Sequence, residues 1–141
     1  MIRINKENLF RPYILVNLIL LIIILLIFLY SIIFTSEKLN YPVKSNYTLL
    51  TGKSSISTGL SRSFSEIIRF NLDKAKAYNP YGIGIFLFFL IQLILRIGIT
   101  FVLHFFPLKN KLILYSDIFL SLALFLFFFW PFLKEMFTVF L

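Results

Sequence analysis

The residues most able to do chemistry lie inside apolar stretches of the chain. Four polar side chains recur at every fourth position: Gln92, Arg96, Thr100 and His104. A spacing of four places them on one face of a helix. The next apolar stretch carries Ser116, Asp117 and Ser121 near its start. A guanidinium and a carboxylate in such surroundings can pair with each other, carry protons or ions, or receive a charged partner.

Arg96 and Asp117 are predicted to pair across a helical hairpin. Residues 104–111 contain Pro107 and Asn110, which are typical of a turn between antiparallel helices. Arg96 precedes His104 by eight residues, which is about 12 Å of helix. Asp117 lies five residues after Leu112, where the next run begins, which places the two within reach at similar depth. We therefore expect an ion pair supported by Gln92 or Thr100.

Two interpretations of this polar set stay open. In the first, it holds helices together, or Arg96 extends its charge to the lipid headgroups. In the second, it forms a proton or ion path, or a docking site for a charged helix of another protein. Asn17 is interpreted either as an interfacial residue or as a helix–helix contact.

No set of residues indicates catalysis. The chain has no cysteine and a single histidine, His104, which the sequence gives no partner as a base or metal ligand. It also lacks a Gly-rich phosphate loop and a nucleophile–histidine–acid set. We therefore predict a protein that is not an enzyme and uses no cofactor or metal.

The elements that position these residues are apolar enough to cross a membrane. Hydrophobic residues make up 60% of the 141 residues, with 19 Phe, too many for a soluble fold of this size. Three apolar runs, at residues 13–34, 81–103 and 112–133, each have the roughly 20 residues that a bilayer-spanning helix needs. We predict an all-α membrane protein with three transmembrane helices in a single integral membrane domain, residues 1–141.

The segment between the first two runs, residues 35–80, is different in character. Residues 35–57 are polar and predict a loop. Between residues 60 and 77 the apolar side chains have helical spacing, and they are Leu60, Phe64, Ile67, Ile68, Leu72 and Ala75. This predicts an amphipathic helix that lies in the membrane interface or re-enters the bundle. Ser63 and Glu66 have the spacing of a capping box, with a helix start nearer Thr58 as the alternative.

Three short patterns in the middle of the chain resemble a known family. They are Leu-Thr-Gly at residues 50–52, Ser-Ile-Ser-Thr-Gly-Leu-Ser-Arg at 55–62 and Tyr-Asn-Pro at 78–80. The composite resembles the domain-of-unknown-function 2752 family of small bacterial membrane proteins, over residues 50–103. Ser55 and Thr58 stand where that family has two cysteines, so a metal or redox role of that pair cannot operate here.

The matching residues Gly59, Arg62, Asn79 and Pro80 are expected to act on the backbone and packing, or as a partner site. We expect Gly59 to allow a tight turn or close helix contact. Arg62 would hold loop carbonyls or a lipid phosphate. Asn79 would cap the helix that Pro80 opens.

The net charge of +8 is attributed to lipid headgroups and membrane orientation, not to nucleic acid. The middle segment and the C-terminus, which share one side of the membrane, carry more basic residues than the other side, and this favours a cytoplasmic middle segment. The N-terminal tail and the 104–111 turn carry theirs at a higher density, and this favours a cytoplasmic N-terminus, which we adopt. The expected location is the bacterial cytoplasmic (inner) membrane, as a multi-pass protein.

The expected function is a small accessory or assembly subunit of a larger membrane complex. The alternatives are a homo-oligomeric channel or transporter subunit and a degenerate relative of a cysteine-bearing redox or metal-binding protein.

Overall fold

The computed structural model describes residues 7–37, 56–105 and 111–140, and every element in them is helical. The elements are α1 (Glu7–Ile33), α3 (Leu60–Ile68), α4 (Leu72–Tyr78), α5 (Gly82–Phe105) and α6 (Lys111–Phe140). Three of these helices contain stretches long and apolar enough to cross a membrane, at Pro12–Ile33, Gly82–Leu103 and Leu112–Lys134. The predicted fold of three spans, with shorter helical structure between the first and second, is confirmed. The protein is a multi-pass membrane protein.

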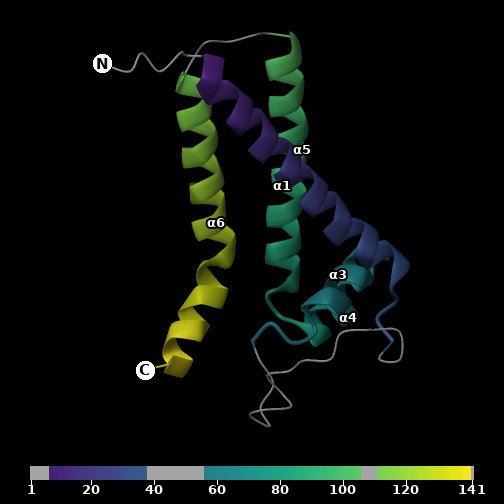
Figure 1. The fold of residues 1–141 in the computed structure, drawn as a ribbon. Helices are drawn as coiled ribbons and strands as arrows, with labels where there is room; N and C mark the ends of the chain where they lie inside the picture. The colour runs from purple at the N-terminus through teal and green to yellow at the C-terminus, as the bar shows by residue number, and fades with distance from the viewer. Residues whose placement is uncertain (1–6, 38–55, 106–110, 141) are drawn as a thin grey trace.

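The three long helices diverge from one end of the molecule. Helices α5 and α6 run antiparallel, and α1 crosses them obliquely, close to both near its own N-terminus (Figure 1). Farther along, α1 leans away from α6 toward α3 and α4, which lie at the opposite end of the molecule (Figure 1). Within α6, Pro131 removes a backbone hydrogen bond, and the ribbon changes direction in this half of the helix. The result is a wedge between α1 and α6.

The amphipathic segment forms two helices and not the single helix expected over residues 60–77. Helix α3 ends at Ile68 and α4 begins at Leu72, because Phe70 has a φ of 61°, a conformation that stops a helix. The predicted capping box is also wrong. Gly59 occupies the N-cap of α3 without a side-chain cap, and Glu66 bonds elsewhere.

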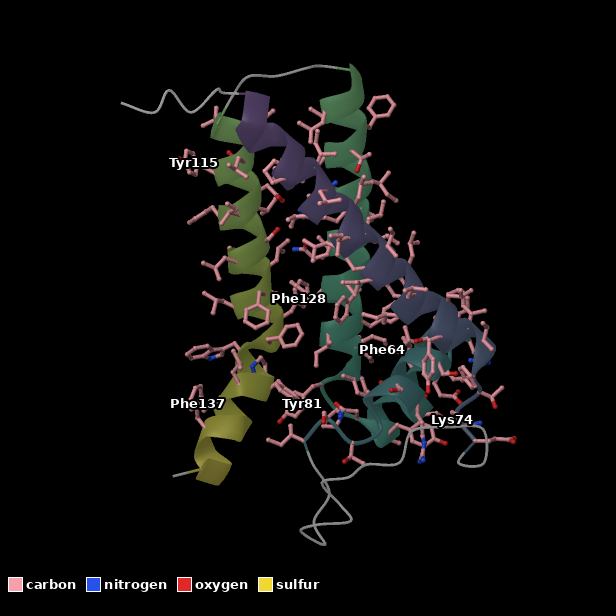
Figure 2. The ribbon with its side chains drawn as sticks, in the orientation of Figure 1. Phe64, Lys74, Tyr81, Tyr115, Phe128 and Phe137 are labelled. Atoms are coloured by element: carbon pink, nitrogen blue, oxygen red, sulfur yellow. The ribbon has the colours of Figure 1, made fainter. Side chains whose placement is uncertain are left out.

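The buried face of α3 is more polar than its apolar spacing indicates. Its buried residues are Ser63, Phe64, Ser65 and Glu66, whereas Leu72 of α4 is exposed. Phe64 packs edge-on against Phe86 and Phe89 of α5, with ring centroids 5.3 and 6.1 Å apart (Figure 2). Ser65 and Glu66 face the end of α1, whereas Ser63 lies against Gly82 at the start of α5.

Three polar residues of α3 and its C-cap fasten this helix to the end of α1. Ser65 Oγ donates to the carbonyl of Phe34 at 2.6 Å, and Ser36 Oγ donates to Glu66 Oε1. Arg69 Nη2 donates to the carbonyl of Ile32 at 3.1 Å. A cation is favourable there because the last carbonyls of a helix lack partners and carry partial negative charge.

Candidate functional site

The predicted ion pair between Arg96 and Asp117 is present. Arg96 Nη1 donates to Asp117 Oδ2 at 2.8 Å and Nη2 donates to Oδ1 at 2.5 Å. The residues are 3% and 8% exposed. A two-pronged arrangement of this kind matches the flat guanidinium to the carboxylate and is the strongest geometry for such a pair. It joins α5 to α6 within the apolar spans.

Gln92 and Ser121 complete the polar surroundings of the guanidinium. Arg96 Nη2 donates to Ser121 Oγ at 2.7 Å and to Gln92 Oε1 at 3.3 Å. Gln92 precedes Arg96 by one helical turn and Ser121 follows Asp117 by one turn. The support predicted from Gln92 or Thr100 therefore comes from Gln92, because Thr100 does not contact the guanidinium.

Thr100 contributes through α1 instead. Asn17 Nδ2 donates to Thr100 Oγ1 at 2.8 Å and to the carbonyl of Arg96 at 3.2 Å. Its Oδ1 accepts from Arg96 Nη1 at 3.1 Å. Asn17 is thus a helix–helix contact, the second of its two interpretations, and it belongs to the site.

Tyr13 is a further member that sequence reasoning missed. Its hydroxyl donates to Asp117 Oδ2 at 2.9 Å, so α1 contacts the carboxylate as well as the guanidinium. A tyrosine near the end of a span is usually assigned to the membrane interface, so a contact with Asp117 was not expected. The spacing of four between Tyr13 and Asn17, on one face of α1, is the signal that could have found it.

The polar cluster is electrically neutral but leaves two donors unused. Gln92 Nε2 and Arg96 Nε are buried and have no hydrogen-bond acceptor among the described residues. A buried donor without an acceptor is unfavourable. Gln92 also lies halfway along the candidate span Gly82–Leu103.

The polar cluster forms the polar part of a cavity that lies between the diverging helices α1 and α6. The cavity has a volume of about 650 Å³, within the usual range of about 300–1,000 Å³ for ligand sites. Its polar lining comes from Tyr13, Gln92, Arg96, Asp117 and Ser121. Its apolar walls include Val16, Leu20 and Ile23 of α1, Phe88 of α5, and Ile118 and Leu122 of α6. The arrangement can receive an apolar body that carries a neutral hydrogen-bond acceptor.

The described residues offer no metal centre, since no three His, Cys, Asp or Glu side chains in them gather closely enough to hold an ion. The side chain of His104 lies outside the described residues. The polar loop expected over residues 35–57 and the turn at 104–111 also fall largely outside them.

The second candidate set comprises Gly59, Arg62, Asn79 and Pro80. It packs the segment before α3 against the segment before α5, and we call this contact the structural lock. Gly59 has a φ of 82°, and a Cβ at this position would collide with the carbonyl oxygen of Tyr78. Asn79 is buried and its Nδ2 donates to the carbonyls of Ile56 and Thr58 at 2.9 and 3.1 Å. The two motif segments therefore pack directly on each other.

The remaining motif residues extend this lock. Asn79 Oδ1 accepts from the backbone N–H of Tyr81 at 2.9 Å, just before α5, while the Asn79 backbone forms the C-cap of α4. Pro80 does not open the helix as predicted, because α5 begins two residues later, at Gly82. The Arg62 guanidinium lies 5.8 Å from the centre of the Tyr78 ring, a cation–π distance.

Comparison of the chain with protein-family models, curated proteins and solved structures finds no match in any of the three. The resemblance to the domain-of-unknown-function 2752 family stays a prediction.

Proposed function

We propose that this chain is a small accessory subunit that docks on, assembles or stabilises a larger membrane-protein complex of the bacterial inner membrane. The observation that carries the proposal is the cavity between α1 and α6, whose polar lining includes Gln92. The Nε2 donor of this residue is buried and has no acceptor among the described residues, and we place it near the middle of the membrane. We assign this cavity to a transmembrane helix of the partner.

The depth of Gln92 favours a helix over a phospholipid. The ester oxygens of a phospholipid lie near the headgroups, about 15 Å from the centre of a hydrocarbon core about 30 Å thick. An acyl chain would fill the apolar walls but would leave Gln92 Nε2 without an acceptor. A helix can present a Ser, Thr, Asn or Gln oxygen at any depth, and such groups join helices in membranes.

The charge balance of the site specifies a neutral contact. Asp117 already pairs with Arg96 within the chain, so a partner carboxylate would introduce an uncompensated buried charge. The same pairing favours the accessory role over the homo-oligomeric channel, in which Arg96 and Asp117 would face a shared lumen. We therefore expect a partner helix with an uncharged oxygen acceptor and no acidic residue at this depth.

Co-purification tests the proposal. The tagged chain is extracted from its native membrane in mild detergent, and the partners and assembly mass are determined by mass spectrometry. A larger membrane protein in fixed stoichiometry supports the accessory role, and Gln92→Leu should reduce its recovery. Ile94→Ala, an exposed position on the same helix outside the cavity, is the matched control. A lone chain or a pure homo-oligomer would contradict the proposal.

A further inference from the structure

The turn between α3 and α4 departs from the usual residue preference at a helix end. Asn71 N–H donates to the carbonyl of Glu66 and Phe70 N–H donates to that of Ile67, each at 2.9 Å. This is the Schellman pattern, in which the residue at the position of Phe70 has a left-handed backbone and is usually Gly, sometimes Asn. A bulky residue with positive φ is strained there.

Within the part of the chain that the structure describes, side-chain packing does not offset this strain. The Phe70 side chain is 90% exposed, and Leu72 beside it is 50% exposed. Both residues lie outside the three candidate spans, so lipid contact along a span does not account for their exposure. An aromatic side chain held out of the fold at a strained turn indicates an external contact.

The position of the turn relative to the membrane identifies that contact. Arg69, the neighbour of Phe70, donates to the carbonyls of Ser31 and Ile32 at 3.5 and 3.1 Å. These are among the last residues of the span Pro12–Ile33. The turn is therefore fixed at the depth where the span ends, which is the boundary between acyl chains and headgroups.

We propose that Phe70 and Leu72 form an interfacial anchor, which inserts into the lipid bilayer beside the end of α1. Aromatic side chains favour this depth. Lys74 and Lys76 of α4 are exposed and can contact lipid phosphates, with Asp73 offsetting one of the two charges. Lys74 lies at the end of the molecule where α3 and α4 gather (Figure 2). The anchor fixes α3 and α4 on the membrane surface.

A tryptophan reporter tests the anchor in the purified full-length chain. The single native tryptophan, Trp130, is replaced by Phe, and Phe70→Trp is introduced in that background. The protein is reconstituted in phosphatidylcholine vesicles with or without bromine on the acyl chains. Ala77→Trp in the same background is the control, because Ala77 is an exposed residue of α4 that belongs neither to the anchor nor to the lysines beside it.

We expect emission from position 70 to be blue-shifted and quenched by the brominated chains, with weaker quenching at position 77. Emission typical of water, or equal quenching at the two positions, would overturn the proposal. A spin label on Phe70→Cys gives a second measurement, since the chain contains no other cysteine. Greater collision with oxygen than with a water-soluble nickel complex is expected, and the reverse would also overturn the anchor.

Discussion

Asn17 of α1 and Arg96 of α5 contact each other through both ends of the Asn17 amide. The Asn17 Nδ2 donates to the Arg96 carbonyl at 3.2 Å, and Oδ1 accepts from Arg96 Nη1 at 3.1 Å. Because the same guanidinium pairs with Asp117 of α6, Arg96 connects all three spans. Lipid gives apolar helices little reason to associate, so contacts of this kind determine which helices pack together.

Replacing both members of the ion pair should destabilise the bundle by less than the two single replacements added together. Arg96→Leu and Asp117→Leu each leave one buried charge without its partner, which costs about 3–5 kcal/mol. The double substitution removes both charges, so its loss should be smaller than the sum of the single losses. Unfolding of the four proteins in detergent measures this coupling. Additive losses would show that the two side chains do not interact.

Asn17→Leu should loosen α1 from the α5–α6 hairpin. The substitution removes three hydrogen bonds, and we expect a loss of about 1–2 kcal/mol in unfolding free energy. Val16→Ala, at an adjacent position with an exposed side chain, should change stability much less. Equal effects of the two substitutions in detergent unfolding would mean that Asn17 makes no specific contact.

Gly59→Ala should be harmful, whereas Gly98→Ala should not. The left-handed backbone of Gly59 and the nearby Tyr78 carbonyl leave no room for a Cβ, so a loss of about 1–3 kcal/mol is expected. Gly98 lies within α5 with no atom within 4 Å of a Cβ, and alanine there should stabilise the helix by about 0.5–1 kcal/mol. Thermal unfolding in detergent compares the two, and a harmless Gly59→Ala would disprove the lock.

The contact between α3 and α1 should weaken in acid. The hydrogen bond from Ser36, with a further one from Asn71, outweighs the effect of burial, which alone would raise the pKa, and the pKa of Glu66 is lowered from its ordinary value. With the folded pKa lowered, this carboxylate contributes stability above its unfolded pKa, and the contribution is lost as pH falls through the lowered value.

Glu66→Gln and Ser36→Ala test this dependence. Both variants should be less stable than the wild type at neutral pH, and the difference should shrink as pH falls to about 3, below the ordinary glutamate pKa of about 4.3. The measurement is the unfolding midpoint in detergent across this pH range. Curves parallel to that of the wild type would show that Glu66 does not link stability to pH.

The sequence predicts the spans and the ion pair because both rest on strong, local constraints. Runs of more than 20 apolar residues have few alternatives to a membrane helix. Opposite charges at matching depths on the two helices of a hairpin are expected to pair. Asn17 and Tyr13 were harder to assign, because their contacts depend on the crossing of α1 over a hairpin far away in the chain. The one-helix prediction for residues 60–77 failed because spacing does not reveal a left-handed Phe70. The polar face of α3 was missed because its partners lie at the end of α1.

The most direct test of the accessory role is photocrosslinking in the native membrane from two neighbouring positions of α6. Ile118 lines the cavity, whereas Phe119 does not and is 75% exposed. Each is replaced in turn by a photoreactive phenylalanine analogue, and the adducts are identified by mass spectrometry. The account predicts that position 118 crosslinks to a transmembrane helix of the partner that co-purifies in fixed stoichiometry, and that position 119 does so much less. Crosslinks from position 118 only to lipid or to a second copy of the chain would contradict it.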